Sequence, residues 1–351
     1  MYTNATTKRI NIGALAIGGG APVSIQSMLS RPAHDIEGNV AQALALQAAG
    51  CDIVRVSVPD MQTLKTVKAI KNNVQIPLVA DIHFDWRLAV ESVYAGVDNV
   101  RINPGNIGDE SRVREVARVC NTKNIPIRIG VNSGSLEKEI LARHGGATPQ
   151  AMVESGLYHI SLLEKYDFNN IVLSLKSSDT QRMYDAYVLA AQKCSYPLHL
   201  GVTEAGTEKM GVIKSAAGIG GLLLRGIGDT LRISLTDDPV LEVESAKRLL
   251  KALGLRNEGI KFVSCPTCGR TAIDLIGIAK AAEERLGGIN KDITVAIMGC
   301  VVNGPGEATA ADIGIAGGKD CGVIFKHGNI IHSKVPEDKL LDILEDEIKK
   351  M

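Results

Sequence analysis

Three cysteines near the end of the chain have the spacing of a thiolate metal centre. Cys265 and Cys268 flank a Pro-Thr pair, and Cys300 follows a strand-like apolar run. A Gly/Pro-rich loop then leads from Cys300 to Glu307. Thiolates on tight turns are suited to soft metals, including zinc and the iron of iron–sulfur clusters. Reduced core cysteines would explain a lone C-x-x-C pair, but a third cysteine in a matching glycine loop favours a metal site.

The fourth ligand of this site has two candidates. Cys321 would complete an all-thiolate site, compatible with structural zinc or an iron–sulfur cluster. Glu307 would instead supply a harder and more exchangeable oxygen ligand. Cys321 begins an apolar strand-like run, which favours a core role for it. The remaining cysteines, Cys51, Cys120 and Cys194, lie beside predicted helix ends and are interpreted as small buried hydrophobic residues.

Cations recur in successive apolar, strand-like runs of the first 250 residues. They are Arg55, Arg101, Arg128, Lys176 and Arg232. Five cations aimed at one small volume would repel one another unless an anion lies among them, and the guanidinium fork matches phosphate oxygens. We therefore predict a small substrate with more than one phosphate. The alternative is that each arginine pairs with a local carboxylate such as Asp52, Asp81 or Asp98.

Further polar residues end the same runs and complete the predicted site. They are Asp81, His83, Asn103, Asn132, Thr203 and Ser234. Asp81 and His83 are two residues apart, so both point to one face of a strand and share a network. Glu204 ends a strand among cations, which suits a carboxylate used in proton transfer. A structural salt bridge from Glu204 to Lys176 or Arg232 is the rival interpretation.

The elements that must position these residues repeat along residues 1–255. Short apolar runs alternate with helical patterns eight times. The predicted strands are residues 23–28, 53–58, 77–83, 99–103, 126–132, 170–176, 197–204 and 229–235. Eight such units predict a TIM (β/α)8 barrel, in which the carboxyl ends of the strands converge on one mouth. An open Rossmann-like sheet is the alternative, but no strand is followed by a dinucleotide glycine fingerprint.

Residues 256–351 have a different pattern and are predicted to form a smaller α+β domain. Strands at 260–264 and 293–298 lead into Cys265 and Cys300, and a hairpin and a terminal helix follow. The metal motif is therefore expected at the strand ends of this second domain.

The composition limits the functional class. Lys plus Arg and Asp plus Glu are balanced at 39 each, so the chain has no global field for nucleic acid or an anionic membrane. Seven irregularly spaced cysteines without a signal-peptide pattern predict a reducing compartment. No apolar run reaches the ~18 residues of a membrane span. A cytoplasmic enzyme that binds neither nucleic acid nor membrane is expected.

These motifs resemble those of the 4-hydroxy-3-methylbut-2-enyl diphosphate synthase family, iron–sulfur enzymes of the non-mevalonate isoprenoid pathway. The most specific matches are Cys265-Pro266-Thr267-Cys268-Gly269-Arg270 and the run from Met298-Gly299-Cys300 to Gly306-Glu307. Strand-end segments such as Ala80-Asp81-Ile82-His83 and Gly201-Val202-Thr203-Glu204-Ala205-Gly206 match as well. The resemblance covers nearly the whole chain, at the length of the compact bacterial form.

The resemblance implies a 4Fe–4S cluster on Cys265, Cys268, Cys300 and Glu307. It implies reductive dehydration and ring opening of 2-C-methyl-D-erythritol 2,4-cyclodiphosphate, with reduced flavodoxin or ferredoxin as electron donor. It also implies a homodimer in which the barrel of one chain faces the cluster domain of the other. The cations would then hold the diphosphate, Asn103 and Asn132 would orient it, and Glu204 is predicted to be the proton donor.

Two other classes of function remain as alternatives. A non-redox barrel lyase or aldolase acting on a phosphorylated sugar would carry a structural zinc in the second domain and use Lys176 as a Schiff-base lysine. A non-catalytic metal-binding adaptor is the other, but such a module has no use for a charged barrel mouth.

Overall fold

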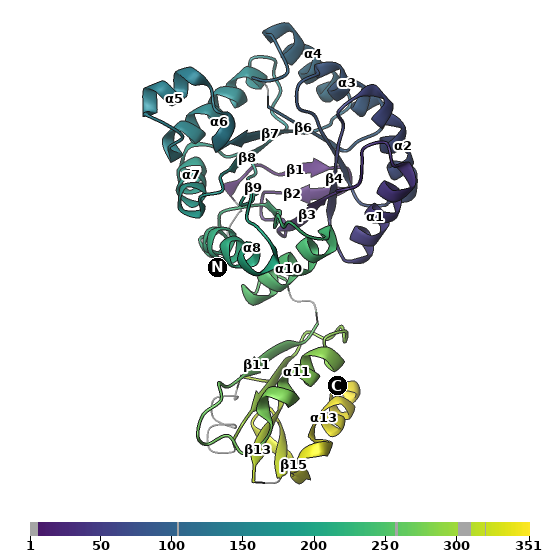
Figure 1. Cartoon of the computed structure of the whole chain (residues 1–351), viewed down its shortest axis with the longest axis vertical. Helices are drawn as coiled ribbons and strands as arrows, with labels where there is room; N and C mark the ends of the chain where they lie inside the picture. The colour runs from purple at the N-terminus through teal and green to yellow at the C-terminus, as the bar shows by residue number, and fades with distance from the viewer. Residues whose placement is uncertain (1–5, 104, 257–258, 301–309, 320) are drawn as a thin grey trace. The chain divides into compact units, whose positions relative to one another are not determined.

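The computed structural model describes residues 6–103, 105–256, 259–300, 310–319 and 321–351. The chain divides into two compact units, Met1–Arg256 and Asn257–Met351, which Figure 1 colours from purple to green and from green to yellow. None of the described helices combines the length and the apolar character that a membrane crossing requires.

The first unit is a parallel barrel surrounded by helices, which confirms the predicted fold (Figure 1). Its strands are hydrogen-bonded in the order β8-β7-β6-β5-β4-β3-β10-β9, and a parallel bridge between Leu173 and Leu198 joins the two ends of the sheet. All carboxyl ends therefore meet at one mouth. The barrel strands are β3 (Ser24–Met28), β4 (Ile53–Ser57), β5 (Leu78–Asp81), β6 (Asn99–Ile102), β7 (Ile127–Asn132), β8 (Ile171–Lys176), β9 (His199–Leu200) and β10 (Thr230–Leu231).

Several of the helices around the barrel begin at side-chain caps. Asp35, Asp85, Asp109 and Asp179 each accept a hydrogen bond from a backbone N–H of the following first turn, which satisfies a donor that the helix leaves free. These helices and turns are α1 (Ile36–Ala48), η2 (Met61–Thr63), α2 (Leu64–Asn73), α3 (Trp86–Tyr94), α4 (Glu110–Thr122), η3 (Ser133–Ser135), α5 (Lys138–His144), α6 (Pro149–Glu164), α7 (Thr180–Lys193), α8 (Glu208–Ser215), η4 (Ala216–Gly220), α9 (Gly221–Leu224) and α10 (Pro239–Ala252).

An N-terminal hairpin that the sequence did not predict covers the amino ends of the barrel strands. Its strands β1 (Ile10–Ile12) and β2 (Leu15–Ile17) pair antiparallel, and Figure 1 shows them across the middle of the ring. Their isoleucines form one buried cluster with Ile53, Val79 and Val172 of the barrel interior. The hairpin therefore fills this end with apolar side chains and leaves the polar mouth at the other end.

Parts of the barrel differ from the predicted pattern of strands or add to it. The strands predicted at 197–204 and 229–235 are shortened to β9 and β10, and after β9 Thr203 N donates to Ser177 O at 3.2 Å. The stretch at 133–148 contains the short helix α5. Helices α8 and α9 are joined by the π-helical turn η4, where Gly218 packs closely against α7: a Cβ on Gly218 would lie 2.5 Å from Met183 Cε.

The described part of the second unit contains a mixed sheet and the helices α11 and α13, as predicted for an α+β domain. Strands β11, β12 and β13 are parallel, and β14 and β15 add antiparallel at one edge. Arg285 of α11 pairs with Asp342 and Glu345 of α13, which ties the two helices together. The elements are β11 (Lys261–Ser264), α11 (Leu275–Leu286), β12 (Thr294–Met298), β13 (Ile313–Gly318), β14 (Cys321–Lys326), β15 (Asn329–Pro336), η5 (Glu337–Lys339) and α13 (Leu340–Lys350).

Candidate active site

A cavity of about 320 Å³ lies at the carboxyl ends of the barrel strands. All of the predicted substrate-binding residues except Asn103 line this cavity. Met28, Gly130 and Ser174 also line it, and the sequence did not predict them. Gly130 and Ser174 lie two positions from predicted residues on the same strands, so strand periodicity would have found them, whereas no site residue was predicted on the strand of Met28.

Asp81 is the carboxylate at the centre of the cavity wall. Its Oδ1 accepts a hydrogen bond from Arg101 Nη1 at 3.1 Å, and its Oδ2 lies 3.7 Å from Arg55 Nε. Burial alone would raise the pKa of Asp81, but the two guanidinium groups outweigh it and lower this pKa to about 2. His83 Nε2 lies 3.8 Å from the same Oδ2, so these residues share a network.

The other carboxylates considered from the sequence pair elsewhere. Asp52 Oδ2 lies 3.4 Å from Arg256 Nη1, and Asp98 Oδ2 lies 2.6 Å from Lys71 Nζ. Neither therefore neutralises an arginine of the cavity. The second carboxylate that does so is Glu242 of α10, whose Oε1 lies 2.8 Å from Arg232 Nη2 and which sequence reasoning did not select.

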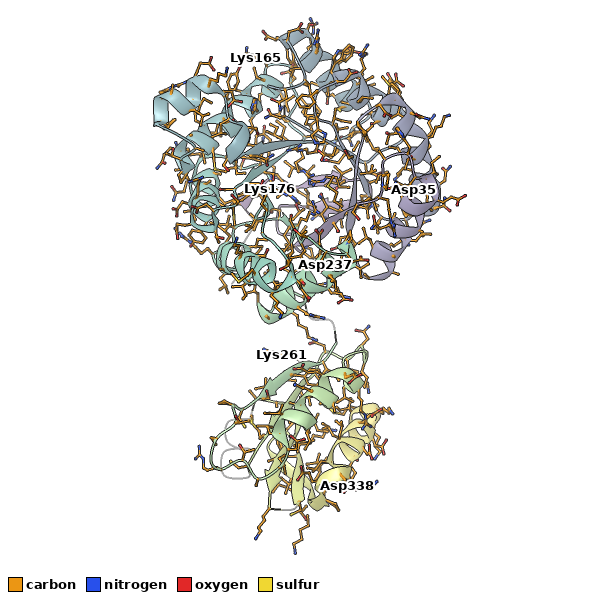
Figure 2. The ribbon with its side chains drawn as sticks, in the orientation of Figure 1. Asp35, Lys165, Lys176, Asp237, Lys261 and Asp338 are labelled. Atoms are coloured by element: carbon orange, nitrogen blue, oxygen red, sulfur yellow. The ribbon has the colours of Figure 1, made fainter. Side chains whose placement is uncertain are left out.

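Arg128 and Lys176 lack a carboxylate partner among the described residues. Arg128 Nη1 donates to Gln26 Oε1, while its buried Nη2 has no hydrogen-bond partner there. Figure 2 shows Lys176 inside the ring of the barrel. Burial and repulsion from Arg55 and Arg232 hold the pKa of Lys176 well below its ordinary range.

The charges of the cavity do not balance within the part of the chain that the structure describes. Five cations, four of them arginines, face only two carboxylates. A buried excess of positive charge is costly without an anion to offset it. The geometry therefore defines a site for a compact polyanion, and the arginine forks suit phosphate oxygens.

Two glycines make room for the long cationic side chains. A Cβ on Gly130 would lie 2.6 Å from Arg101 Nη2 and 2.8 Å from its Cζ, so the guanidinium occupies the space that another residue would fill. Arg101 Nη2 also donates to Gly130 O at 3.3 Å. Similarly, a Cβ on Gly201 would lie 3.1 Å from Lys176 Nζ. A glycine within a strand often marks such a close approach.

Glu204 occupies a strained backbone conformation beside the cavity. Its φ of 53° lies in the left-handed region, which is unfavourable for a residue with a side chain. The segment is fixed on both sides, since Thr203 N donates to Ser177 O and Gly206 O accepts from Thr236 N. Glu204 is exposed and forms no ion pair with Lys176 or Arg232 among the described residues. The rival salt-bridge interpretation is therefore not supported by these contacts.

Asn103 does not line the cavity. It is 5% exposed, and its Oδ1 accepts a hydrogen bond from Gly105 N at 3.1 Å. Its side chain therefore shapes the loop after β6, a role that strand parity could not separate from substrate contact.

The cysteines of the C-x-x-C motif and Cys300 follow neighbouring parallel strands. Cys265 comes directly after β11 and Cys300 two residues after β12, and Gly299 N donates to Cys265 Sγ at 3.2 Å. A Cβ on Gly299 would lie 3.0 Å from Thr271 Cγ2, so this glycine lets the two loops approach closely. Hydrogen bonds from Arg270, first from its backbone N–H, lower the pKa of Cys268. N–H donors that favour thiolates fit a soft metal centre.

The ligand set cannot be completed from the described residues. Glu307 lies outside them, and no three Cys, His, Asp or Glu side chains within them are arranged to hold a metal ion. Cys321 begins β14, two strands from β12 at the same end of the sheet, and is half-buried. Burial raises the pKa values of Cys51 and Cys120 to about 12, as expected for unreactive core thiols.

The fold and the site define a barrel enzyme for a phosphorylated substrate with a cysteine-rich second unit. A profile of the GcpE TIM-barrel domain matches residues 7–247, and one of the GcpE protein C-terminal domain matches residues 261–350. The chain therefore belongs to the GcpE family. A protein of Clostridium perfringens named 4-hydroxy-3-methylbut-2-en-1-yl diphosphate synthase (flavodoxin) is 57% identical over 96% of this chain and 97% of its own. A protein of Caldanaerobacter subterraneus subsp. tengcongensis with the same name is 55% identical over 98% of this chain and 97% of its own.

Solved structures of other enzymes share the barrel alone. A 3-dehydroquinate dehydratase from Geobacillus kaustophilus superposes with a TM-score of 0.53 at 14% identity, covering 72% of this chain and 98% of that one. A dihydropteroate synthase from Yersinia pestis superposes with a TM-score of 0.52 at 13% identity, covering 71% of this chain and 99% of that one. At this level of identity, the similarity indicates a shared fold and does not indicate a shared activity.

Replacing Gly130 by alanine is expected to weaken anion binding without unfolding the barrel. The added methyl group displaces the end of a flexible side chain, so the cost to stability is small, but Arg101 moves away from Asp81. We expect about tenfold weaker binding of inorganic diphosphate in calorimetric titrations of the full chain, with a little-changed melting temperature. The control is Gly134→Ala, where a Cβ meets open space. Equal affinities of Gly130→Ala and wild type would contradict this packing argument.

Diphosphate binding is expected to take up a proton at Lys176. A bound polyanion offsets the burial and the repulsion that depress the pKa of Lys176, so this pKa rises on binding. The affinity should be highest below the free-state pKa and decline as pH rises from the free-state to the bound-state value. Titration calorimetry in two buffers with different ionisation enthalpies measures the proton uptake. The same titration of Lys176→Met is the control, because it measures the protons that diphosphate itself takes up or releases. Equal proton uptake by Lys176→Met and wild type would disprove the coupling.

Proposed function

We propose that this chain is a 4-hydroxy-3-methylbut-2-en-1-yl diphosphate synthase of the non-mevalonate isoprenoid pathway. It would reductively open 2-C-methyl-D-erythritol 2,4-cyclodiphosphate and release water. The observation that carries this proposal is the excess of buried cations in the barrel cavity, in a chain that is 57% identical to a protein of that name over 96% of its length. The cavity accounts for the diphosphate, and the two further requirements are electrons and a proton.

The diphosphate would lie among the cations of the cavity. Arg128 and Lys176, which have no carboxylate partner among the described residues, supply charge from the cavity wall. Arg55, Arg101 and Arg232 retain N–H groups beyond those that contact Asp81 and Glu242. Asn132, Thr203 and Ser234 offer uncharged partners for the hydroxyl and bridging oxygens. These contacts would fix the carbon skeleton at the mouth.

A 4Fe–4S cluster is the cofactor that the second unit would hold. Cys265, Cys268 and Cys300 would be ligands, and Glu307 is proposed as the fourth. The close glycine loops and the N–H groups directed at the sulfur atoms fit such a centre. When bound, the cluster supplies the two electrons of the reduction. An oxygen ligand in place of a fourth thiolate would make the centre open to substrate.

Glu204 is proposed as the proton donor for the departing hydroxyl group. It follows Thr203, which lines the cavity, and its strained backbone is held by hydrogen bonds on both sides. Strain that the surrounding structure maintains is common at functional positions. A carboxyl group on this held backbone, beside the cavity and outside its ion pairs, is placed to deliver a proton to a bound substrate.

The remaining proposals concern partners and location. The names of the relatives support flavodoxin as the electron donor, and ferredoxin is the other candidate. The homodimer with a shared active site and the cytoplasmic location stay predictions from the sequence. A lyase that uses Lys176 as a Schiff base is less well supported, because Lys176 lies among guanidinium groups suited to an anion.

Replacing Glu204 by glutamine is expected to abolish turnover selectively. The amide keeps the size of the side chain and cannot donate a carboxyl proton, so we expect a loss of about 10²–10⁴-fold in kcat. Diphosphate affinity and the visible spectrum of the loaded enzyme should stay unchanged. Glu208→Gln, four residues further along, is the matched control and should retain full activity. Normal turnover by Glu204→Gln would remove this residue from the mechanism.

Anaerobic purification is expected to give a brown protein with about four iron and four sulfide per chain. Cys265→Ser and Cys300→Ser should lose both elements, whereas diphosphate binding by the barrel persists because it uses none of these side chains. Cys194→Ser, in the first unit, is the control and should keep its iron. A colourless protein that contains zinc without iron would instead support the non-redox lyase.

A further inference from the structure

We propose that Glu242 is a positioning residue of the anion site, which fixes the Arg232 guanidinium in the orientation that binds phosphate oxygens. This inference rests on the proposed function of the barrel cavity. Glu242 lies on α10, outside the strands, and is 2% exposed. It does not line the cavity, so it acts on a bound anion only through the residues it holds.

The carboxylate of Glu242 accepts four hydrogen bonds from three places in the barrel. Its Oε1 accepts from Arg232 Nη2 at 2.8 Å and from Leu235 N at 3.1 Å. Its Oε2 accepts from Arg232 Nε at 2.9 Å and from Ser27 Oγ at 2.8 Å. A paired contact through Nε and Nη2 fixes both the position and the plane of the guanidinium.

This contact determines which edge of Arg232 is available to a ligand. A guanidinium has five N–H bonds, and Glu242 accepts two of them. The remaining three belong to Nη1 and Nη2, on the side away from the Nε–Glu242 contact. Arg232 lines the cavity, and its Nη1 donates a hydrogen bond to Met28 Sδ at 3.4 Å, which leaves two N–H groups for an anion. The free edge is therefore presented to an anion as a rigid fork.

The charge of Glu242 argues that orientation is its role. A negative charge beside the cavity reduces the positive field that attracts an anion. If Glu242 acted on the anion through its charge alone, removing that charge would tighten anion binding. If it positions Arg232, replacing one carboxylate oxygen by an NH₂ group would free the guanidinium to move and weaken anion binding. The two roles therefore predict opposite signs for the same substitution.

Glutamine at position 242 would break the fork at either end. One oxygen of the carboxylate becomes an NH₂ group, and each oxygen accepts one bond from Arg232 and one from a neighbouring group. Whichever way the amide turns, its hydrogens face a donor N–H of Arg232. Arg232 thus retains at most one of its two hydrogen bonds, while the volume of the buried side chain is preserved.

The test measures binding of inorganic diphosphate to the full chain by titration calorimetry, alongside the melting temperature. We expect Glu242→Gln to bind about tenfold more weakly than wild type. In an Arg232→Ala background, Glu242→Gln should change the affinity little, because the residue through which it acts is absent. Ser27→Ala, which removes one hydrogen bond to Glu242 and leaves the Arg232 pair intact, is the control for general disturbance and should bind as wild type does.

Unchanged or tighter binding by a folded Glu242→Gln would overturn the inference. So would an equal loss of affinity in the wild-type and Arg232→Ala backgrounds, which would indicate a general effect on the barrel. If Glu242→Gln fails to fold, Glu242→Asp gives the same test, because the shorter side chain keeps the charge but cannot reach both Nε and Nη2 of Arg232. It should then bind more weakly than wild type, and wild-type affinity would overturn the inference. Failure of the wild-type chain to bind diphosphate would instead reject the proposed function.

Discussion

Uncompensated positive charge inside the barrel mouth is the constraint on which the rest of the site depends. Four arginines and a lysine share one cavity with Asp81, and Glu242 pairs with one of them from behind the barrel wall. Barrel interiors usually contain branched apolar side chains at this level. Here the apolar layer is confined to the amino ends of the strands, where the β1–β2 hairpin supplies isoleucines to complete it. The fold therefore keeps its apolar packing at one end and its charge at the other.

The cations are held apart by neighbours that fix their geometry. Asp81 lies between Arg55 and Arg101, Gln26 holds Arg128, and Gly130 gives the Arg101 side chain its space. Each contact uses only some of the N–H groups of its arginine. Every arginine therefore has a partner that fixes its position and still has N–H donors for a ligand. A site built in this way is preorganised, since little reorientation is needed when an anion arrives.

The sequence predicted the barrel and most of the cavity because both follow from periodicity. Asn103 was selected because it is a polar residue at the end of a predicted strand, two positions from Arg101, yet its amide oxygen accepts from Gly105 N. Parity specifies a face and cannot specify a contact. Glu242 was missed for the opposite reason, because a carboxylate on a helix resembles a solvated residue until the fold places it against Arg232. The β1–β2 strands were missed because three residues are too few to show an alternating pattern.

The two units carry opposite electrostatic requirements, which gives a reason for the separate cores. Guanidinium groups would pair with thiolates if both were packed into one interior, and each site would lose the charge that its ligand needs. The barrel core and the second core contain the two sets of groups on different elements. The cavity thus retains its excess of positive charge for a polyanion, while Cys265, proposed as a cluster ligand, packs against the second core.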